Sequence, residues 1–279
     1  MAAFCQKRPI GESMSSVSLP PGTLESLQRI NTDFLRCVVP LFWMKRGVAI
    51  HAGCGFFIDD GSRQYLVSAA HVLEQTHQGT LFFGIEGRQY RSIVEPQMLT
   101  GGKGLHDTLD IGVVRVPDLR LRPPAAPVSI SMLGPNRRDG DLYTFGGFPS
   151  SKGGRKASRA ELVYQSYCYA GVPAMPGAYV AVGVSESTHH LITFNKRSIA
   201  KGVGSEPSIQ TFPDPKGMSG SPVWLLANGP PPRPVLVGVL TRWMKREHVI
   251  VATDIGVVLE AIRRLSTTEE SEAMQTDAA

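Results

Sequence analysis

Short apolar segments, broken by turn residues, recur through most of this chain and predict a protein made mainly of β-strands. In the first half, segments of strand length lie at 38–43, 53–58, 64–69, 80–85, 88–93 and 110–116. The separators, such as 59–61 and 101–104, carry the Gly and Asp residues that tight turns prefer. Six strands at this spacing favour a closed antiparallel barrel.

A second set of apolar segments follows a Pro-rich connection at 122–127, which marks a domain boundary. Its predicted strands are 141–146, 160–169, 179–184, 190–195, 221–226, 235–242 and 248–253. Residues 254–265 have the pattern of an amphipathic helix, and Leu24, Leu27, Ile30 and Phe34 show helical spacing near the start. We therefore expect an all-β protein with an N-terminal extension and short helix (1–37), a first β-barrel (38–122), a second β-barrel with a C-terminal helix (123–265) and an acidic disordered tail (266–279).

The bulk composition narrows the class of protein. The 279 residues are 42% hydrophobic and include 29 Gly and 21 Pro, which suits an all-β core with many turns. No run of about 18 apolar residues is present, so no membrane span is expected. The net charge of +5 comes with basic clusters, but solvated loops explain them, and no aromatic interleaving or binding motif favours nucleic acid as a partner.

The N-terminus and the cysteines bear on the cellular compartment. The first residues contain no apolar core of the kind that a secretory signal requires. The cysteines, Cys5, Cys37, Cys54 and Cys168, are scattered without a C-x-x-C pair, so we expect no zinc site, and we expect no other metal or cofactor. We interpret them as reduced thiols and expect a cytoplasmic protein.

Residues 215–224 hold the first candidate for chemistry, a serine between glycines in a turn that runs into an apolar strand. A nucleophilic serine needs its hydroxyl on a tight bend, with N–H groups aimed at the oxygen that becomes negative. Here the hydroxyl would be that of Ser219, and the donors would be the N–H groups of Gly217 and Ser219. Taken alone, the segment is equally consistent with a plain turn.

Two further segments change that interpretation. His71 follows two small residues at the end of a predicted strand, and Asp110 opens another apolar strand. The chain order His71, Asp110, Ser219 is that of chymotrypsin, and it differs from the orders of subtilisin and of the α/β-hydrolases. Through Ala-Ala-His, Asp-Ile-Gly-Val-Val-Arg-Val and Gly-Met-Ser-Gly-Ser-Pro, the sequence resembles the trypsin/chymotrypsin-like serine peptidases over roughly residues 38–265.

The resemblance implies two six-stranded antiparallel barrels, with the active site in the cleft between them. His71 would then accept the proton of Ser219, and Asp110 would hold the correct tautomer of the imidazole. The N–H groups of Gly217 and Ser219 would bind the oxyanion.

The resemblance also implies a set of substrate-binding residues. The segment Thr241, Arg242 and Trp243 corresponds to the one that pairs with the substrate backbone in the family, and residues just before the nucleophile would line the first specificity pocket. Among these, Asp214 would favour basic substrate side chains, whereas Lys216 would favour acidic ones. The sequence therefore leaves the substrate preference open.

Other residues in the same segments admit alternatives. Asp107 competes with Asp110, which is preferred because it directly precedes the apolar run. His189 and His190 are neighbours on a predicted strand and would face opposite ways, so they are not expected to chelate one metal together. Met218 stands where zymogen-activated relatives carry an aspartate, and we infer that no N-terminal cleavage is needed to form the oxyanion hole.

The leading hypothesis is an intracellular serine endopeptidase that acts on a protein or peptide substrate and is restrained by a regulatory partner or stimulus. The alternative is a non-enzymatic binding module on the same scaffold, since a fold does not guarantee its chemistry. Such modules usually lose at least one of the three residues, and none is lost here.

Overall fold

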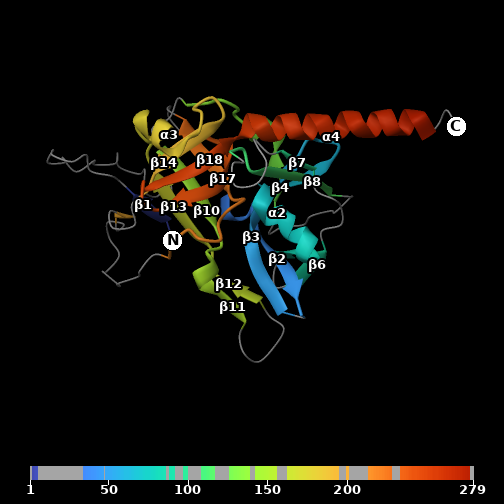
Figure 1. The fold of residues 1–279 in the computed structure, drawn as a ribbon, viewed down its shortest axis with the longest axis horizontal. Coiled ribbons are helices and arrows are strands. Elements are labelled where there is room, and N and C mark those ends of the chain that lie inside the picture. Colours follow the sequence, from blue (N-terminus) through green and yellow to red (C-terminus); the bar gives the residue numbers. More distant parts are fainter. Residues whose placement is uncertain are drawn as a thin grey trace.

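Most of the chain folds into two curled β-sheets with a long helix across one side, as Figure 1 shows. The computed structural model describes residues 2–5, 34–46, 48–85, 88–91, 97–99, 108–116, 126–138, 142–155, 162–194, 199–200, 213–227 and 233–276. None of the helices in these ranges is both long and apolar enough to cross a membrane.

The first sheet is built from residues 38–129. Its strands are β2 (Val38–Lys45), β3 (Val48–Asp59), β4 (Gln64–Ala69), β5 (Leu81–Ile85), β6 (Arg88–Arg91), β7 (Gln97–Leu99), β8 (Ile111–Val116) and β9 (Val128–Ser129). They run in the order β6-β5-β2-β3-β4-β8-β7, and β9 pairs with β3. All of these pairs are antiparallel except β3 with β9.

The second sheet is built mainly from residues 142–254. Its strands are β1 (Ala2–Cys5), β10 (Leu142–Gly147), β13 (Tyr167–Gly171), β14 (His189–Thr193), β15 (Ile199–Ala200), β16 (Pro222–Ala227), β17 (Arg233–Met244) and β18 (Val249–Asp254). Their order is β14-β18-β17-β16-β10-β13-β1-β15. A separate hairpin, β11 (Gly153–Arg155) with β12 (Leu162–Tyr164), lies at the bottom of Figure 1.

A shared hydrophobic core holds the two sheets together. In it, Val67 of β4 and Val239 of β17 belong to one buried cluster, together with the inner face of helix α4 (Ile255–Thr276). Phe34 stacks on Trp224 of β16, with ring centroids 4.2 Å apart and planes within 3° of parallel. Stacked aromatic pairs of this size dominate the energetics of the cores they occupy. The contact therefore holds the segment that leads into β2 of the first sheet against β16 of the second.

The strand β4 shows why the predicted strands lack a simple alternation of apolar and polar residues. Leu66 packs into a core on one face of the sheet, and Tyr65 and Val67 pack into the shared core on the other. Because both faces are buried, Tyr65, Leu66 and Val67 follow one another with no polar residue between them. Its predicted bounds, 64–69, are those of the structure.

One predicted strand is wrong. Residues 179–184 were expected to be extended, but the structure has helix α3 (Gly177–Val182) in their place. Tyr179 and Val182 pack into a small core, whereas Val180 between them is 86% exposed, so the inward positions repeat every three residues instead of every two. Gly183 ends the helix with φ +75°, the left-handed conformation typical of a helix C-terminus.

Two other expectations are corrected. The acidic tail after Ser266 was expected to be disordered, but α4 continues to Thr276, past the end of the sheets in Figure 1. The segment 266–276 contains no Gly or Pro, and its middle, 269–275, is mostly Glu, Ala, Met and Gln, which are good helix formers. The single strand predicted at 160–169 is two strands, β12 and β13, separated by Gln165 and Ser166. The N-terminal helix, apart from Phe34, lies outside the described residues.

Candidate active site

His71 and Asp110 are brought together where β4 and β8 lie side by side. β4 ends at Ala69, and the one-turn helix α2 (Ala70–Leu73) places His71 at the end of the strand. One carboxylate oxygen of Asp110 accepts the backbone N–H of His71 at 3.0 Å, and the other lies 2.7 Å from His71 Nδ1. Since a carboxylate only accepts, the ring proton sits on Nδ1 and Nε2 is left as an acceptor.

Asp110 is held in an unusual backbone conformation. Its φ of +49° lies in the left-handed region, which Asp tolerates better than most residues but which still costs energy. The second sheet holds the preceding segment in place, because His189 Nε2 donates to the carbonyl of Thr108 at 2.6 Å and the hydroxyl of Thr253 donates to that of Leu109 at 2.6 Å. Both contacts come from strands of the second sheet, so the position of Asp110 depends on the docking of the two sheets. Asp107, its competitor in the sequence, lies outside the described residues.

Ser219 sits on a tight turn at the start of β16. The N–H of Met218 donates to Pro215 O at 3.0 Å, and the N–H of Gly220 donates to Leu240 O at 2.7 Å. The carbonyl of Ser219 itself accepts the N–H of Cys54, on the first sheet, at 2.7 Å. Its hydroxyl donates to the carbonyl of Thr241 at 3.1 Å. In the described part of the chain, Ser219 Oγ and His71 Nε2 form no hydrogen bond, so the hydroxyl is turned toward β17.

The backbone at Gly217 points a donor at this turn. Ser150 N–H donates to the carbonyl of Lys216 at 2.8 Å. Because the peptide bond is planar and trans, the N–H of Gly217 points away from Ser150. Neither this N–H nor that of Ser219 has a hydrogen-bond partner among the described residues. Gly217 has φ +90°, and a Cβ there would run into the backbone of Ser150, so the position requires glycine.

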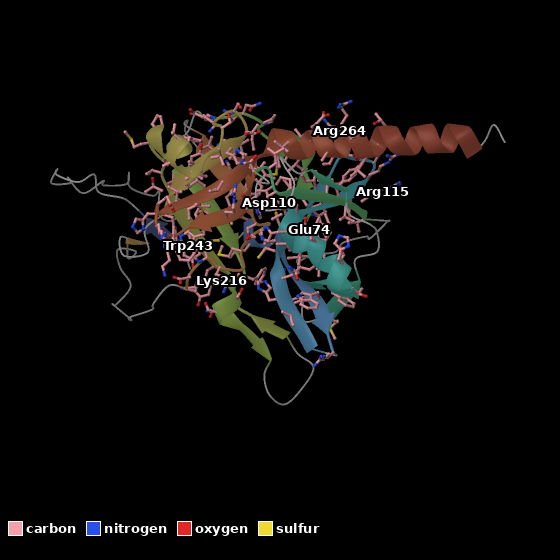
Figure 2. The ribbon with its side chains drawn as sticks, viewed as in Figure 1. Glu74, Asp110, Arg115, Lys216, Trp243 and Arg264 are labelled. Carbon is pink, nitrogen blue, oxygen red and sulfur yellow. The ribbon has the colours of Figure 1, made fainter. Side chains whose placement is uncertain are left out.

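A cavity of about 470 Å³ joins these groups between the two sheets. It is lined by His71, Asp110, Pro215, Lys216, Gly217, Ser219, Leu240, Thr241, Arg242, Trp243 and Met244. Figure 2 shows Asp110, Lys216 and Trp243 around the middle of the molecule, where the sheets meet. Among the candidates whose structure is described, the cavity thus gathers all that were named from the sequence except Asp214, which does not line it.

A buried thiol lies directly behind the turn. Cys54 Sγ accepts the N–H of Phe148 at 3.3 Å and donates to Gly217 O at 3.4 Å. Burial raises the pKa of the Cys54 thiol to about 11, so it stays protonated and is a poor nucleophile. Cys54 is a free thiol, as the sequence led us to expect.

Another group beside the turn, the half-buried His51, is expected to make this region sensitive to acid. Its Nδ1 lies 3.4 Å from Ser150 Oγ, and desolvation by burial lowers its pKa to about 4 from an ordinary value of 6.5. Between these two pH values the unfolded chain binds a proton at His51 that the folded chain does not. Stability therefore falls as the pH falls through this window, by up to about 3 kcal/mol.

We expect His51→Gln to remove this contribution. The free energy of unfolding of the variant, measured by urea titration from pH 7 to pH 4.5, should fall less steeply than that of the wild type by roughly 1.4 kcal/mol per pH unit. His77→Gln, which removes an exposed imidazole, serves as the matched control and should keep the wild-type slope. Equal slopes for His51→Gln and the wild type would show that His51 does not cause the acid sensitivity.

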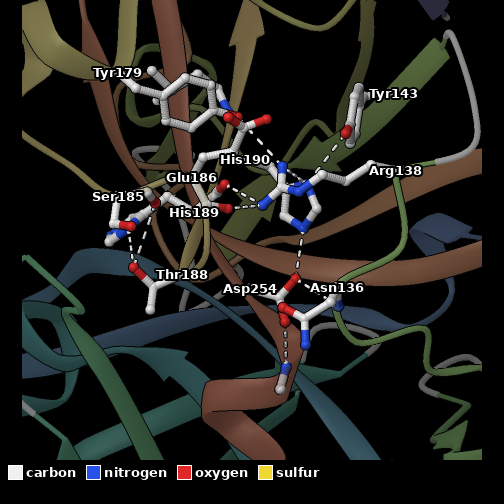
Figure 3. Close-up of polar contacts among 12 residues, drawn as sticks. Asn136, Arg138, Tyr143, Tyr179, Ser185, Glu186, Thr188, His189, His190 and Asp254 are labelled. Carbon is white, nitrogen blue, oxygen red and sulfur yellow. Dashed lines mark hydrogen bonds and ion pairs between the residues drawn. The ribbon is translucent and has the colours of Figure 1, made fainter. Parts of the chain in front are cut away.

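A second histidine–aspartate pair, His190 with Asp254, is buried in the other sheet (Figure 3). His190 Nε2 lies 2.8 Å from Asp254 Oδ2, and its Nδ1 lies 3.2 Å from a guanidinium nitrogen of Arg138 and 3.1 Å from the Tyr143 hydroxyl. Because arginine only donates, Nδ1 accepts and the ring proton sits on Nε2. The other carboxylate oxygen of Asp254 accepts the N–H of Gly256 at 2.7 Å, at the start of α4. With both ring nitrogens engaged and no surface exposed, the pair supports the fold.

The two adjacent histidines on β14 face different neighbours, as predicted. His189 reaches Thr108 of the first sheet, whereas His190 reaches Asp254. Among the described residues, no cluster of three or more His, Cys, Asp or Glu side chains is arranged to hold a metal ion. Sequence reasoning did not find Ser150 or Arg138. Asp254 could have been recognised as a helix cap, because it is the first residue of the segment predicted to be helical.

Comparison with known proteins identifies the architecture. No family model matches the sequence, and no similar curated protein is found. The structure resembles that of neuropsin, a serine protease expressed in the limbic system of mouse brain, with a TM-score of 0.53 and 14% identity over 84% of this chain and 96% of that one. It resembles GrC (granzyme C) to the same degree, with a TM-score of 0.53 and 14% identity over 85% of this chain and 96% of that one. The predicted fold class is confirmed: the chain has the chymotrypsin-like double-barrel fold with a C-terminal helix.

Proposed function

We propose that this protein is a serine endopeptidase that cleaves peptide bonds through an acyl-enzyme. The observation that carries the proposal is the pairing of His71 with Asp110 at the edge of a cavity that also contains Ser219. Asp110 fixes the ring proton on Nδ1, so Nε2 is available as a base. The resemblance of the fold to two serine proteases supports the proposal without assigning these roles.

In the proposed reaction, the hydroxyl of Ser219 leaves Thr241 O and turns to His71 Nε2. As Oγ attacks the substrate carbonyl carbon, its proton passes to Nε2, and the carbonyl oxygen becomes an oxyanion bound by the N–H groups of Gly217 and Ser219. His71 then gives the proton to the leaving amine, and the C–N bond breaks to form the acyl-enzyme. Water, deprotonated by His71, releases the acid and restores Ser219.

The oxyanion donors need no proteolytic activation in this proposal. Met218, which occupies the position before the nucleophile, is fully buried in the core of the second sheet. A thioether there makes no ion pair with a new N-terminus, and the hydrogen bond from Ser150 to Lys216 already orients the Gly217 N–H. A partner or stimulus inside the cell would then restrain the enzyme by a route other than cleavage of its N-terminus.

A fluorophosphonate probe tests the proposal. The probe should label the wild-type chain, and Ser219→Ala should remove the labelling. Ser221→Ala is the matched control, because it deletes a buried hydroxyl two residues away and should keep the labelling. The second candidate function, a non-enzymatic binding module, is favoured by the hydrogen bond of the Ser219 hydroxyl to Thr241 in place of His71. Labelling that is absent from the folded wild type, or unaffected by Ser219→Ala, would support that candidate.

A further inference from the structure

The charged groups that line the cavity are mostly cationic. Lys216 and Arg242 face it, and among the residues that the structure describes Asp110 is the only carboxylate in its lining. Both oxygens of Asp110 are already committed to His71. Over the described residues, the lining therefore presents net positive charge to a ligand, and its one carboxylate is already engaged by His71. A low-dielectric groove with charge of one sign favours ligands of the opposite sign.

Arg242 lines the same cavity as Ser219. It follows Thr241, whose carbonyl accepts the hydroxyl of Ser219. Its guanidinium makes a long hydrogen bond of 3.4 Å to Thr108 O, and its Nε–H is buried without a hydrogen-bond partner among the described residues. A buried donor left unpaired is costly, and a guanidinium has the planar geometry to bind a carboxylate with two parallel hydrogen bonds.

Lys216 and Trp243 supply a second cation and an apolar surface in the lining of the cavity. Lys216 is exposed, lines the cavity and directly precedes Gly217, whose N–H is one of the proposed oxyanion donors. Trp243 packs edge-on against Phe194 and has the Lys245 ammonium 5.8 Å from its ring centroid, which gives the cavity a fixed apolar side. The acids closest in the chain to these elements, Asp214 and Glu247, do not line the cavity.

We propose that this site selects peptides with an Asp or Glu side chain close to the scissile bond, and that Arg242, assisted by Lys216, binds the carboxylate. The inference deepens the proposed serine endopeptidase function and rests on it for the cleavage step. It resolves the opposing expectations for Asp214 and Lys216 in favour of Lys216, because Asp214 does not reach the cavity.

The test uses capped peptide pairs that differ only by Asp against Asn at one position, on either side of the scissile bond. At the selected position, kcat/KM for the wild-type chain should be 10- to 100-fold higher with Asp than with Asn, the range expected for one charge-assisted hydrogen-bonded pair. Arg242→Gln should reduce this ratio at least tenfold, and Arg242→Glu should shift the preference to Lys or Arg. Arg246→Gln, an exposed position outside the cavity lining, removes the same charge and should keep the wild-type ratio.

Binding to the Ser219→Ala chain, measured by fluorescence anisotropy with the same peptides, makes the test independent of catalysis. Each peptide is compared in two forms, one with a free C-terminal acid and one with an amidated C-terminus, because a terminal carboxylate has the same chemistry as an Asp or Glu side chain. The inference would be overturned by a preference for the free C-terminal acid alone, or by equal kcat/KM and equal affinity for the Asp and Asn peptides. If the wild-type chain were still labelled by the fluorophosphonate, the proposed function would stand in either case. If the wild-type chain were not labelled but bound Asp peptides selectively, and Arg242→Gln abolished that selectivity, the proposed function would fail and the inference about the acidic ligand would stand.

Discussion

Asp110→Asn should lower kcat for peptide hydrolysis about ten-thousandfold, the loss known when the orienting aspartate of a Ser-His-Asp triad becomes an amide. The reason lies in the two hydrogen bonds of Asp110. One oxygen must remain an acceptor for the backbone N–H of His71, so the new amide nitrogen takes the place of the oxygen that faces Nδ1. The amide then donates to Nδ1, the imidazole proton moves to Nε2, and His71 can no longer accept the proton of Ser219.

The measurement is steady-state kcat, together with the rate of fluorophosphonate labelling and the midpoint of thermal unfolding. Asp59→Asn is the matched control. Asp59 also accepts two hydrogen bonds, from Gly61 N and Gln64 Nε2, but lies at the opposite end of β4 from His71. It should leave kcat within about twofold of wild type. If Asp110→Asn folded normally and kept kcat within tenfold of wild type, Asp110 would not orient the base.

The sequence predicted strands well where buried runs were bounded by turn residues. For β4 the Gly and Asp residues at 59–61 and the small residues after Ser68 mark both ends, and both are in place. The strand prediction at 179–184 was wrong because a helix of six residues is too short for the pattern of apolar and polar positions to show a helical period. Its flanking residues, Pro176 before α3 and Gly183 after it, carry the better signal.

For the candidate site, the residues themselves could be predicted from the sequence, but the contacts that position them could not. His71, Asp110 and Ser219 were named from short segments whose chemistry is local: a strand end, a strand start and a turn. The contacts that position them are made by main-chain groups of distant segments, as when Ser150 N–H binds Lys216 O. Any residue but proline carries such an N–H, so no side-chain pattern marks it. The same holds for the carbonyl of Thr108, which His189 holds from the second sheet.

Gly217→Ala should lower kcat by about a hundred- to a thousandfold, the range for loss of one oxyanion donor, with a smaller change in KM. The new Cβ would lie 2.9 Å from Ser150 N, and this backbone atom cannot move aside as a flexible side chain can. The clash breaks the hydrogen bond from Ser150 to Lys216 O, and the peptide that it holds is then free to turn the Gly217 N–H away from the oxyanion.

Gly61 is the control position that separates the effect of the Cβ clash at Gly217 from the effect of backbone strain. Gly61 has φ +93°, close to the +90° of Gly217, but a Cβ there would meet nothing within 4 Å. Gly61→Ala therefore carries the same backbone penalty, about 1 kcal/mol or more, without the clash, and should lower the midpoint of unfolding while leaving kcat unchanged. A loss of kcat in Gly217→Ala no greater than in Gly61→Ala would mean that the Gly217 N–H does not stabilise the transition state, and that Ser219 acts, if at all, with a different oxyanion donor.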